Sequence, residues 1–181
     1  SDLNEKLPLL HRYIALQQKA LGLDELHMYD LYVPITGDAP IKYNYQEASL
    51  ASVEALKPLG EEYHEILKKA YDERWIDVAE NIGKRSGGYS SGAYSTAPYI
   101  LLNWHDELSN FFTLVHELGH SAHSYFTRST QPKQYGDYSI FLAEIASTTN
   151  ENILTDYLLK KHTDKEAQKY ILNNYLHRFK S

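Results

Sequence analysis

Apolar residues recur at helical spacing along most of the chain, and this periodicity predicts a mainly α-helical protein. In residues 8–21 it predicts a helix with Pro8 in its first turn and with Gly22 as the stop signal. Further helices are predicted over residues 46–82, with a break near Pro58 and Gly60, over 109–128, over 138–161, and from Asp164 towards the C-terminus.

The middle of the chain departs from this helical pattern. Residues 83–98, GKRSGGYSSGAYSTAP, are rich in glycine and serine, which predicts a loop or the edge of a strand. YILLNW at 99–104 is a short candidate strand, and MYDLYVPITGDAP at 28–40 predicts an extended segment and a turn. We therefore expect a multi-helix fold with a short strand or hairpin and a glycine-rich loop before the helix at 109–128.

The stretch FFTLVHELGHSAHSYF, residues 111–126, places three histidines and one glutamate in a run that is otherwise apolar or small. On a helix His116 and His120 lie on the same face, one turn apart, so both imidazoles can reach one metal ion. Glu117 stands beside them, close enough to touch a metal-bound water without being a ligand. In this HExxH pattern the glutamate takes a proton from a water whose pKa zinc lowers from about 16 to about 7.

The alternative is an accidental match of this spacing on a solvated helix face. The flanking residues oppose that interpretation, because Phe111, Phe112 and Leu114 are typical of a buried helix. Unpaired ionisable groups are costly in such a place, and a zinc ion would compensate that cost. We therefore predict one zinc ion per chain.

A catalytic zinc usually has three protein ligands, and the absence of cysteine leaves histidine, aspartate or glutamate for the third. A metzincin pattern is excluded, because His123 and Phe126 stand where it requires glycine and histidine. We favour Glu144 as the ligand, with Glu151 accepting a hydrogen bond from a ligand histidine, although Glu151 shares its helix face and is the rival. His123 is either a satisfied core histidine or a support for the metal or substrate.

Composition limits the other functions. The net charge of −6 argues against nucleic acid as a partner, and no apolar run is long enough to cross a membrane. The lack of cysteine fits a reducing cytoplasm, and SDLNEKLPLL at the start does not resemble a signal peptide. Nucleotide binding by the glycine-rich loop is disfavoured, because the loop lacks the order G-x-x-x-x-G-K. The sixteen tyrosines favour a half-wet groove.

Four motifs in one order carry a resemblance to a known family. They are GAYS at 92–95, PYILLNW at 98–104, FTLVHELGHSAHS at 112–124 and FLAEIASTTNE at 141–151, and MYDLYVP at 28–34 extends them. Together they resemble oligoendopeptidase F, within the thimet-oligopeptidase-like zinc metallopeptidases of the gluzincin group. Four motifs are far more specific than HExxH alone.

The resemblance implies a mostly helical fold around a deep channel, which would limit substrates to short, unstructured oligopeptides. It implies zinc held by His116, His120 and Glu144, with Glu117 as the general base, and it favours Glu144 over Glu151 as the ligand. It also implies that the segment with Gly92, Ala93, Tyr94 and Tyr99 flanks the cleft and binds the peptide backbone. Backbone pairing would let such an enzyme accept many sequences.

The resemblance also implies that residues 1–181 are a piece of a metallopeptidase catalytic domain. Members of the family are much longer, with a helical region before this segment and a substrate-binding segment after it. Such a piece would be a poor catalyst, since lost oxyanion donors cost about 100- to 1000-fold in rate. The alternative function is a zinc-stabilised, peptide-binding scaffold without activity.

Overall fold

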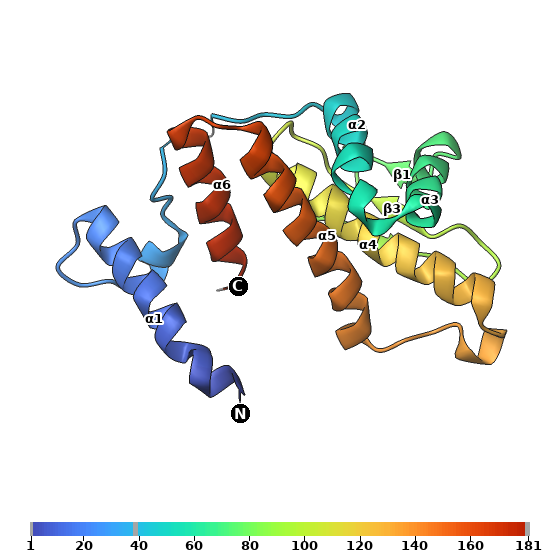
Figure 1. Cartoon of the computed structure of the whole chain (residues 1–181), viewed down its shortest axis with the longest axis horizontal. Coiled ribbons are helices and arrows are strands. Elements are labelled where there is room, and N and C mark those ends of the chain that lie inside the picture. The colour runs from blue at the N-terminus through green and yellow to red at the C-terminus, as the bar shows by residue number, and fades with distance from the viewer. Residues whose placement is uncertain (1, 38–39, 180–181) are drawn as a thin grey trace. The chain divides into compact units, whose positions relative to one another are not determined.

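The computed structural model describes residues 2–37 and 40–179, and it is mainly helical with one small sheet (Figure 1). The predicted fold class is confirmed. The chain divides into two compact units, Ser1–Pro40 with His162–Ser181, and Ile41–Lys161. That the whole chain belongs to one catalytic domain stays a prediction.

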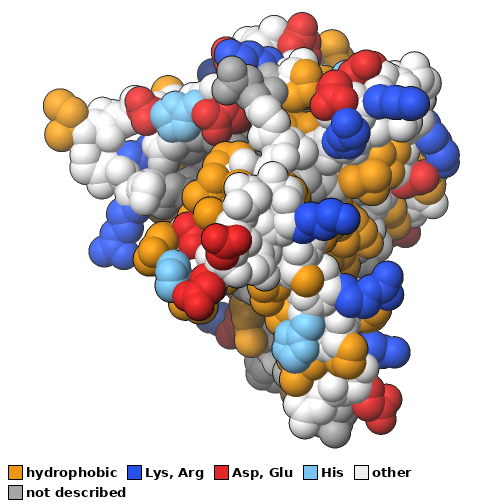
Figure 2. Space-filling model, turned by 90° about the vertical axis from the view of Figure 1, so that its left-hand side faces the viewer, with side chains coloured by type: hydrophobic (Ala, Val, Ile, Leu, Met, Phe, Trp, Pro, Cys, Tyr) orange, Lys and Arg blue, Asp and Glu red, His pale blue; other side chains and the backbone are white. Residues whose placement is uncertain are grey.

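The first unit joins α1 (Asp2–Leu21), the short 3-10 helix η1 (Met28–Tyr32) and α6 (Lys165–Arg178). The Tyr13 hydroxyl of α1 donates to the Asn173 side chain of α6 at 3.2 Å. Asp164 caps α6 by accepting from the Ala167 N–H at 2.9 Å. Figure 2 shows one face of the molecule, on which hydrophobic side chains are exposed between charged and polar ones.

Two predictions in this unit were wrong in detail. The helix predicted at 8–21 begins at Asp2, so Pro8 lies inside it and the bond that a residue-8 N–H would donate to the Asn4 carbonyl is lost. The segment predicted as extended from residue 28 starts instead with η1, because the Asp30 carboxylate accepts from the His27 N–H at 2.8 Å. Residues 38–39 of the predicted turn lie outside the described residues.

The second unit begins with α2 (Tyr45–Ala55), η2 (Lys57–Leu59) and α3 (Glu61–Asp72). The predicted break near Pro58 and Gly60 is confirmed, and Gly60 has a φ of 95°, which favours glycine. The prediction that helix continues to residue 82 was wrong. The chain leaves α3 at Asp72 because the following residues pair with a distant strand, which local periodicity cannot reveal.

That strand belongs to a three-stranded sheet in the order β1-β3-β2. The strands are β1 (Ile76–Asp77), β2 (Tyr89–Ser91) and β3 (Tyr99–Leu101). β1 pairs with β3 in parallel and β2 pairs with β3 antiparallel, with Ser90 opposite Ile100. The predicted strand at 99–104 is therefore shorter than expected, and β2 occupies an outer position within the glycine-rich segment.

Two long helices follow, α4 (Leu108–Thr130) and α5 (Ile140–Lys161), joined through η3 (Lys133–Tyr135). Both long helices were predicted within two residues at each end. They pack against each other in the second unit (Figure 1). Phe111, Phe112 and Leu154 are fully buried. Among the described residues, no helix has the length and apolar character needed to cross a bilayer.

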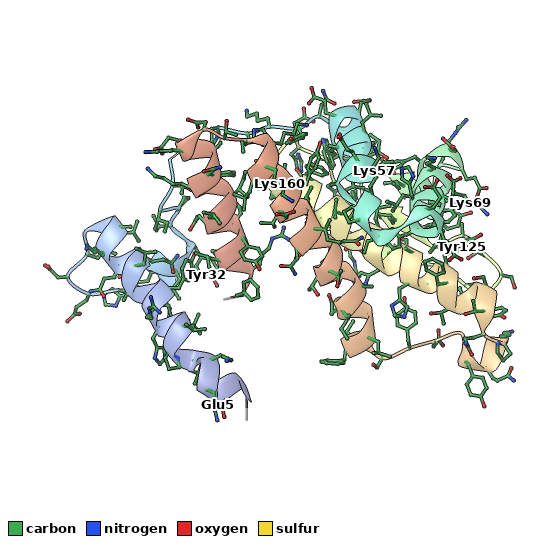
Figure 3. The ribbon with its side chains drawn as sticks, viewed as in Figure 1. Glu5, Tyr32, Lys57, Lys69, Tyr125 and Lys160 are labelled. Atoms are coloured by element: carbon green, nitrogen blue, oxygen red, sulfur yellow. The ribbon has the colours of Figure 1, made fainter. Side chains whose placement is uncertain are left out.

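α3 contacts α4 through a labelled pair of side chains (Figure 3). Lys69 of α3 donates to the Tyr125 hydroxyl of α4 at 3.2 Å, and its amine lies 5.1 Å from the centre of the Tyr125 ring. Helix α4 is therefore held between α3 on one side and α5 on another, which fixes the face on which its histidines stand.

Candidate metal centre

The histidines of HExxH lie one turn apart on α4. The ring centres of His116 and His120 are 4.6 Å apart and the rings are perpendicular. Leu114, Val115 and Leu118 beside them are buried, so the helix is fixed by its apolar side while the imidazoles remain partly accessible. The predicted pairing of these two side chains on one helix face is what the structure shows.

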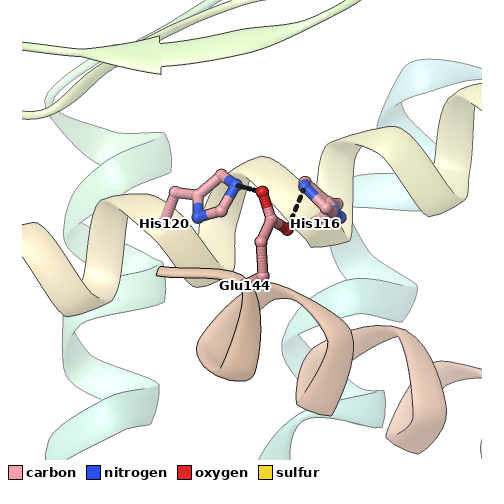
Figure 4. A group of neighbouring side chains, drawn as sticks. All are labelled: His116, His120 and Glu144. Atoms are coloured by element: carbon pink, nitrogen blue, oxygen red, sulfur yellow. Dashed lines mark ion pairs between the residues drawn. The ribbon is translucent and has the colours of Figure 1, made fainter. Parts of the chain in front are cut away.

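Glu144 of α5 lies between the two histidines (Figure 4). One carboxylate oxygen is 3.5 Å from His116 Nε2, and the other is 3.8 Å from His120 Nε2. One donor atom from each residue lies within 4.8 Å of the others. Nitrogen and oxygen ligands at about 2.1 Å around tetrahedral zinc are about 3.4 Å apart, so the observed spacing fits this ion.

Two buried atoms next to this group have no hydrogen-bond partner among the described residues. They are Glu117 Oε2 and His120 Nδ1. Glu117 is only 6% exposed, and burial, the largest influence, raises its pKa above the ordinary value. A buried carboxylate oxygen without a donor is costly, and a water held on a metal ion would supply the donor. The residues present therefore fit a zinc site with Glu117 beside it.

Glu151 orients the first histidine. Its carboxylate lies 2.9 Å from His116 Nδ1, so an N–H at that nitrogen leaves the Nε2 lone pair directed towards Glu144. Burial alone lowers the pKa of His116, but the carboxylates of Glu151, Glu117 and Glu144 together raise it above the ordinary value. Of the two glutamates that the sequence left in competition, Glu144 is the one near both Nε2 atoms.

The second histidine has a different electrostatic environment. Burial lowers the pKa of His120, and the neighbouring His116 lowers it further. A neutral imidazole is the form that binds metal. The two histidines therefore differ, since nearby carboxylates raise the pKa of His116 and burial lowers the pKa of His120.

His123 lies outside the group of three donors. Its ring packs on the Tyr138 ring with centres 4.0 Å apart, and burial lowers its pKa. The Tyr138 hydroxyl is hydrogen-bonded to Ser124 and donates to the His120 carbonyl at 3.4 Å. The placement of His123 agrees with a packing residue near the site, and its support of the metal or substrate stays a prediction.

Of the four predicted substrate-binding residues, Gly92, Ala93 and Tyr94 lie in the loop between β2 and β3, and Tyr99 is the first residue of β3. Arg128 of α4 donates to the Gly92 carbonyl at 2.9 Å, and the Tyr94 hydroxyl donates to the Gln131 carbonyl. Ala93 closes a turn with Thr96, while Tyr99 is half exposed. The loop is therefore anchored on the end of α4, and contact of these residues with substrate stays a prediction.

Sequence reasoning missed one residue that contacts Glu144 within α5 and the residues through which α5 meets α4. Ser147 donates to a Glu144 carboxylate oxygen at 2.9 Å, and Asn150 donates to the Val115 carbonyl at 3.0 Å. Gly119 marks their closest approach, because a Cβ there would lie 2.7 Å from Ser147 Cα. A glycine inside an apolar helix was the available signal, since such glycines often mark close packing.

The fold is mainly helical, and residues 2–181 match the model of peptidase family M3, to which the chain belongs. Over 178 residues it is 58% identical to the oligopeptidase PepF of Bacillus subtilis (strain 168), covering 98% of this chain and 27% of that protein. Over 177 residues it is 58% identical to the group B oligopeptidase PepB of Streptococcus agalactiae serotype III (strain NEM316), covering 98% of this chain and 29% of that protein.

The structural comparison agrees. The crystal structure of oligoendopeptidase-F from Enterococcus faecium superposes with a TM-score of 0.61 at 42% identity, covering 98% of this chain and 23% of that chain. The chain thus spans less than a third of the length of these relatives. The resemblance found in the motifs is confirmed at the level of the family.

Proposed function

We propose that this chain carries the metal ligands and the general base of a zinc-dependent endopeptidase that hydrolyses short, unstructured oligopeptides. The observation that carries the proposal is the position of Glu144 between His116 and His120, with the unpartnered Glu117 Oε2 beside them. Membership of peptidase family M3 and the oligopeptidase relatives support it.

His116, His120 and Glu144 would hold the ion. When bound, zinc supplies Lewis-acid polarisation of a water molecule and of the scissile carbonyl. Glu151 keeps His116 in the tautomer that presents Nε2. Because the ligands come from two helices that are already packed together, little ordering is needed when the metal binds.

Glu117 is the group that moves the proton. Its carboxylate takes a proton from the attacking water and later delivers that proton to the leaving amine. Burial raises its pKa towards the range in which a carboxylate can both accept and release a proton. No covalent acyl-enzyme is formed in this scheme, because water is the nucleophile.

The peptide would lie along β2. Gly88, just before this strand, lies so close over α4 that a Cβ would be 2.7 Å from the Thr113 side chain and 3.4 Å from that of Glu117. β2 is paired with β3 on one side, and its outer edge is the place where an extended peptide would add backbone hydrogen bonds. Such bonds place a scissile carbonyl beside Glu117 without selecting for side chains.

The test is Glu117→Gln in the purified protein. Cleavage of short peptides should fall by about 100- to 10,000-fold, because the general base is removed. Zinc content, measured by elemental mass spectrometry, should stay at about one ion per chain, since Glu117 is not a ligand. Unchanged cleavage would contradict the proposal, and zinc binding without any cleavage in the unmodified protein would favour the scaffold alternative.

A further inference from the structure

The fully buried hydroxyl of Ser147 is directed at a proposed metal ligand. Ser147 lies on α5, three residues after Glu144, and donates to a Glu144 carboxylate oxygen at 2.9 Å. The same hydroxyl lies 3.1 Å from the Glu144 carbonyl and 3.5 Å from the Ala143 carbonyl. It has a single proton, and the carboxylate is both its closest and its only charged acceptor, which makes that bond the strongest.

The backbone of Ser147 is itself fixed by α4. A Cβ added to Gly119 would lie 2.7 Å from Ser147 Cα and 2.9 Å from Ser147 N. The backbones of the two helices are therefore in contact at this point. Gly119 stands between the two ligand histidines in the sequence. The hydroxyl that binds Glu144 is therefore carried by a residue whose backbone is in close contact with the helix that carries the histidines.

A second contact between α4 and α5 lies one turn further along α5. Asn150 is buried, donates to the Val115 carbonyl at 3.0 Å and accepts from the Tyr63 hydroxyl of α3 at 2.9 Å. Val115 and Asn150 directly precede His116 and Glu151, which form their own contact at 2.9 Å. These contacts fix the rotation of α5 relative to α4 close to Glu144.

The Glu144 carboxylate needs such a contact. Its side chain is 44% exposed, and the last torsion of a glutamate is broad, so the two oxygens can turn towards water. In the structure one oxygen faces each histidine at 3.5 and 3.8 Å. A hydrogen bond to one oxygen fixes the rotation of the whole carboxylate.

We propose that Ser147 is a positioning residue, whose hydroxyl holds the Glu144 carboxylate in the orientation that faces both histidines. Ser147 acts through Glu144 and touches neither metal nor substrate. The proposal rests on the proposed function, because the orientation of Glu144 matters to the protein only if Glu144 is a ligand.

The test compares Ser147→Ala with Thr149→Val. Both changes remove a hydroxyl from α5, but the Thr149 hydroxyl donates to the Ile145 carbonyl at 2.6 Å and does not reach a ligand. The dissociation constant for zinc, measured by competition with a chromophoric chelator, should rise by about 10- to 100-fold in Ser147→Ala. It should stay within about twofold of the unmodified protein in Thr149→Val, which lacks such a contact.

A second readout does not depend on metal. In crystals of the metal-free protein, Glu144 should have one carboxylate orientation, and in metal-free Ser147→Ala it should spread over several or turn towards solvent. If the unmodified protein binds no zinc, the proposed function fails, and this comparison alone decides the role of Ser147.

The proposal is overturned if Glu144 keeps the same single orientation in both metal-free proteins. It is also overturned if the protein binds zinc and Ser147→Ala leaves the dissociation constant unchanged, or if Thr149→Val weakens binding as much as Ser147→Ala does.

Discussion

Two groups of side chains in the described residues bring one histidine or more and one carboxylate or more to within metal-binding distance. The two-helix cluster is His116, His120 and Glu144, and the α3 cluster is Glu61, His64 and Glu65. In each, the possible ligand atoms lie within 4.8 Å of one another. Distance alone therefore does not separate them, and the difference lies in what surrounds each group.

The α3 cluster occupies one helix, where residues three and four apart meet on the surface in any case. Its carboxylates are exposed, and Lys68 binds Glu65 at 2.8 Å and lowers its pKa. The two-helix cluster has side chains from α4 and α5, with His116 oriented by Glu151 and Glu144 bound by Ser147. The two groups therefore differ in their support: each of two members of the two-helix cluster has a hydrogen-bonded partner that orients it, whereas the α3 cluster is an exposed set on one helix surface.

The largest expected effect separates the two clusters directly. Glu144→Ala should weaken zinc binding by more than about 100-fold, because a ligand is lost rather than a group that supports one. His64→Ala, in the α3 cluster, should leave the metal content at about one ion per chain. Elemental mass spectrometry of the gel-filtered proteins measures both. Two ions per chain in the unmodified protein, with one lost in His64→Ala, would contradict the distinction.

A smaller effect is expected at the residue that orients His116. Glu151→Gln keeps the shape of the side chain but leaves a weaker, uncharged acceptor for the ring N–H, so zinc affinity should fall by about 10- to 100-fold. The matched control is Glu73→Gln, because Glu73 also accepts from a ring N–H, that of Trp75 at 3.1 Å, away from the cluster. Chelator competition measures both, and equal affinities in the two variants would show that Glu151 does not tune the site.

The smallest expected effect concerns the hydrogen bond from Tyr63 of α3 to Asn150 of α5, beside the two-helix cluster. Burial raises the pKa of Tyr63 to about 12, although its bond to Asn150 opposes the shift. The folded-state pKa lies above the unfolded value of about 10, so the buried Tyr63 hydroxyl favours the folded state as long as it is protonated. This contribution to the free energy of unfolding is intact below pH 10 and is lost as the pH rises towards 12. At pH 11 the loss is about 1.4 kcal/mol.

Tyr63→Phe should therefore be less sensitive to alkali than the unmodified protein. Urea unfolding at pH 8 and at pH 11 gives the two free energies of unfolding for each protein. The decrease between these pH values should be smaller in the variant by about 1.4 kcal/mol. Identical decreases would mean that the Tyr63 hydroxyl is not held in the buried environment that the structure shows.

The sequence predicted the parts of the fold that depend on local pattern. α4 and α5 have long apolar periodicity, and their ends were predicted within two residues. β1 was missed, because Ile76 is a strand residue only through its pairing with Ile100. The start of α1 was missed because Pro8 suggested a first turn, whereas the helix continues through it.

The site divides in the same way. The spacing of His116, Glu117 and His120 is local, so the sequence contained it. Spacing alone only partly favoured Glu144 over Glu151 as the predicted third ligand. The family resemblance then supplied the remaining support for Glu144. The contact of Asn150 with Val115 was out of reach, because it depends on the rotation of α5 against α4, which no single helix pattern encodes. Ser147 stands three residues after Glu144 on the same helix, so helical spacing could have indicated that contact.

The shortness of β2 has a consequence for assembly. An unpaired strand edge is a template on which another chain can stack, and proteins often shorten such edges to prevent it. β2 has only three residues, Tyr89–Ser91, so another copy of the chain would gain few backbone bonds there. The edge is therefore too short for a second copy of the chain to begin a fibril on it.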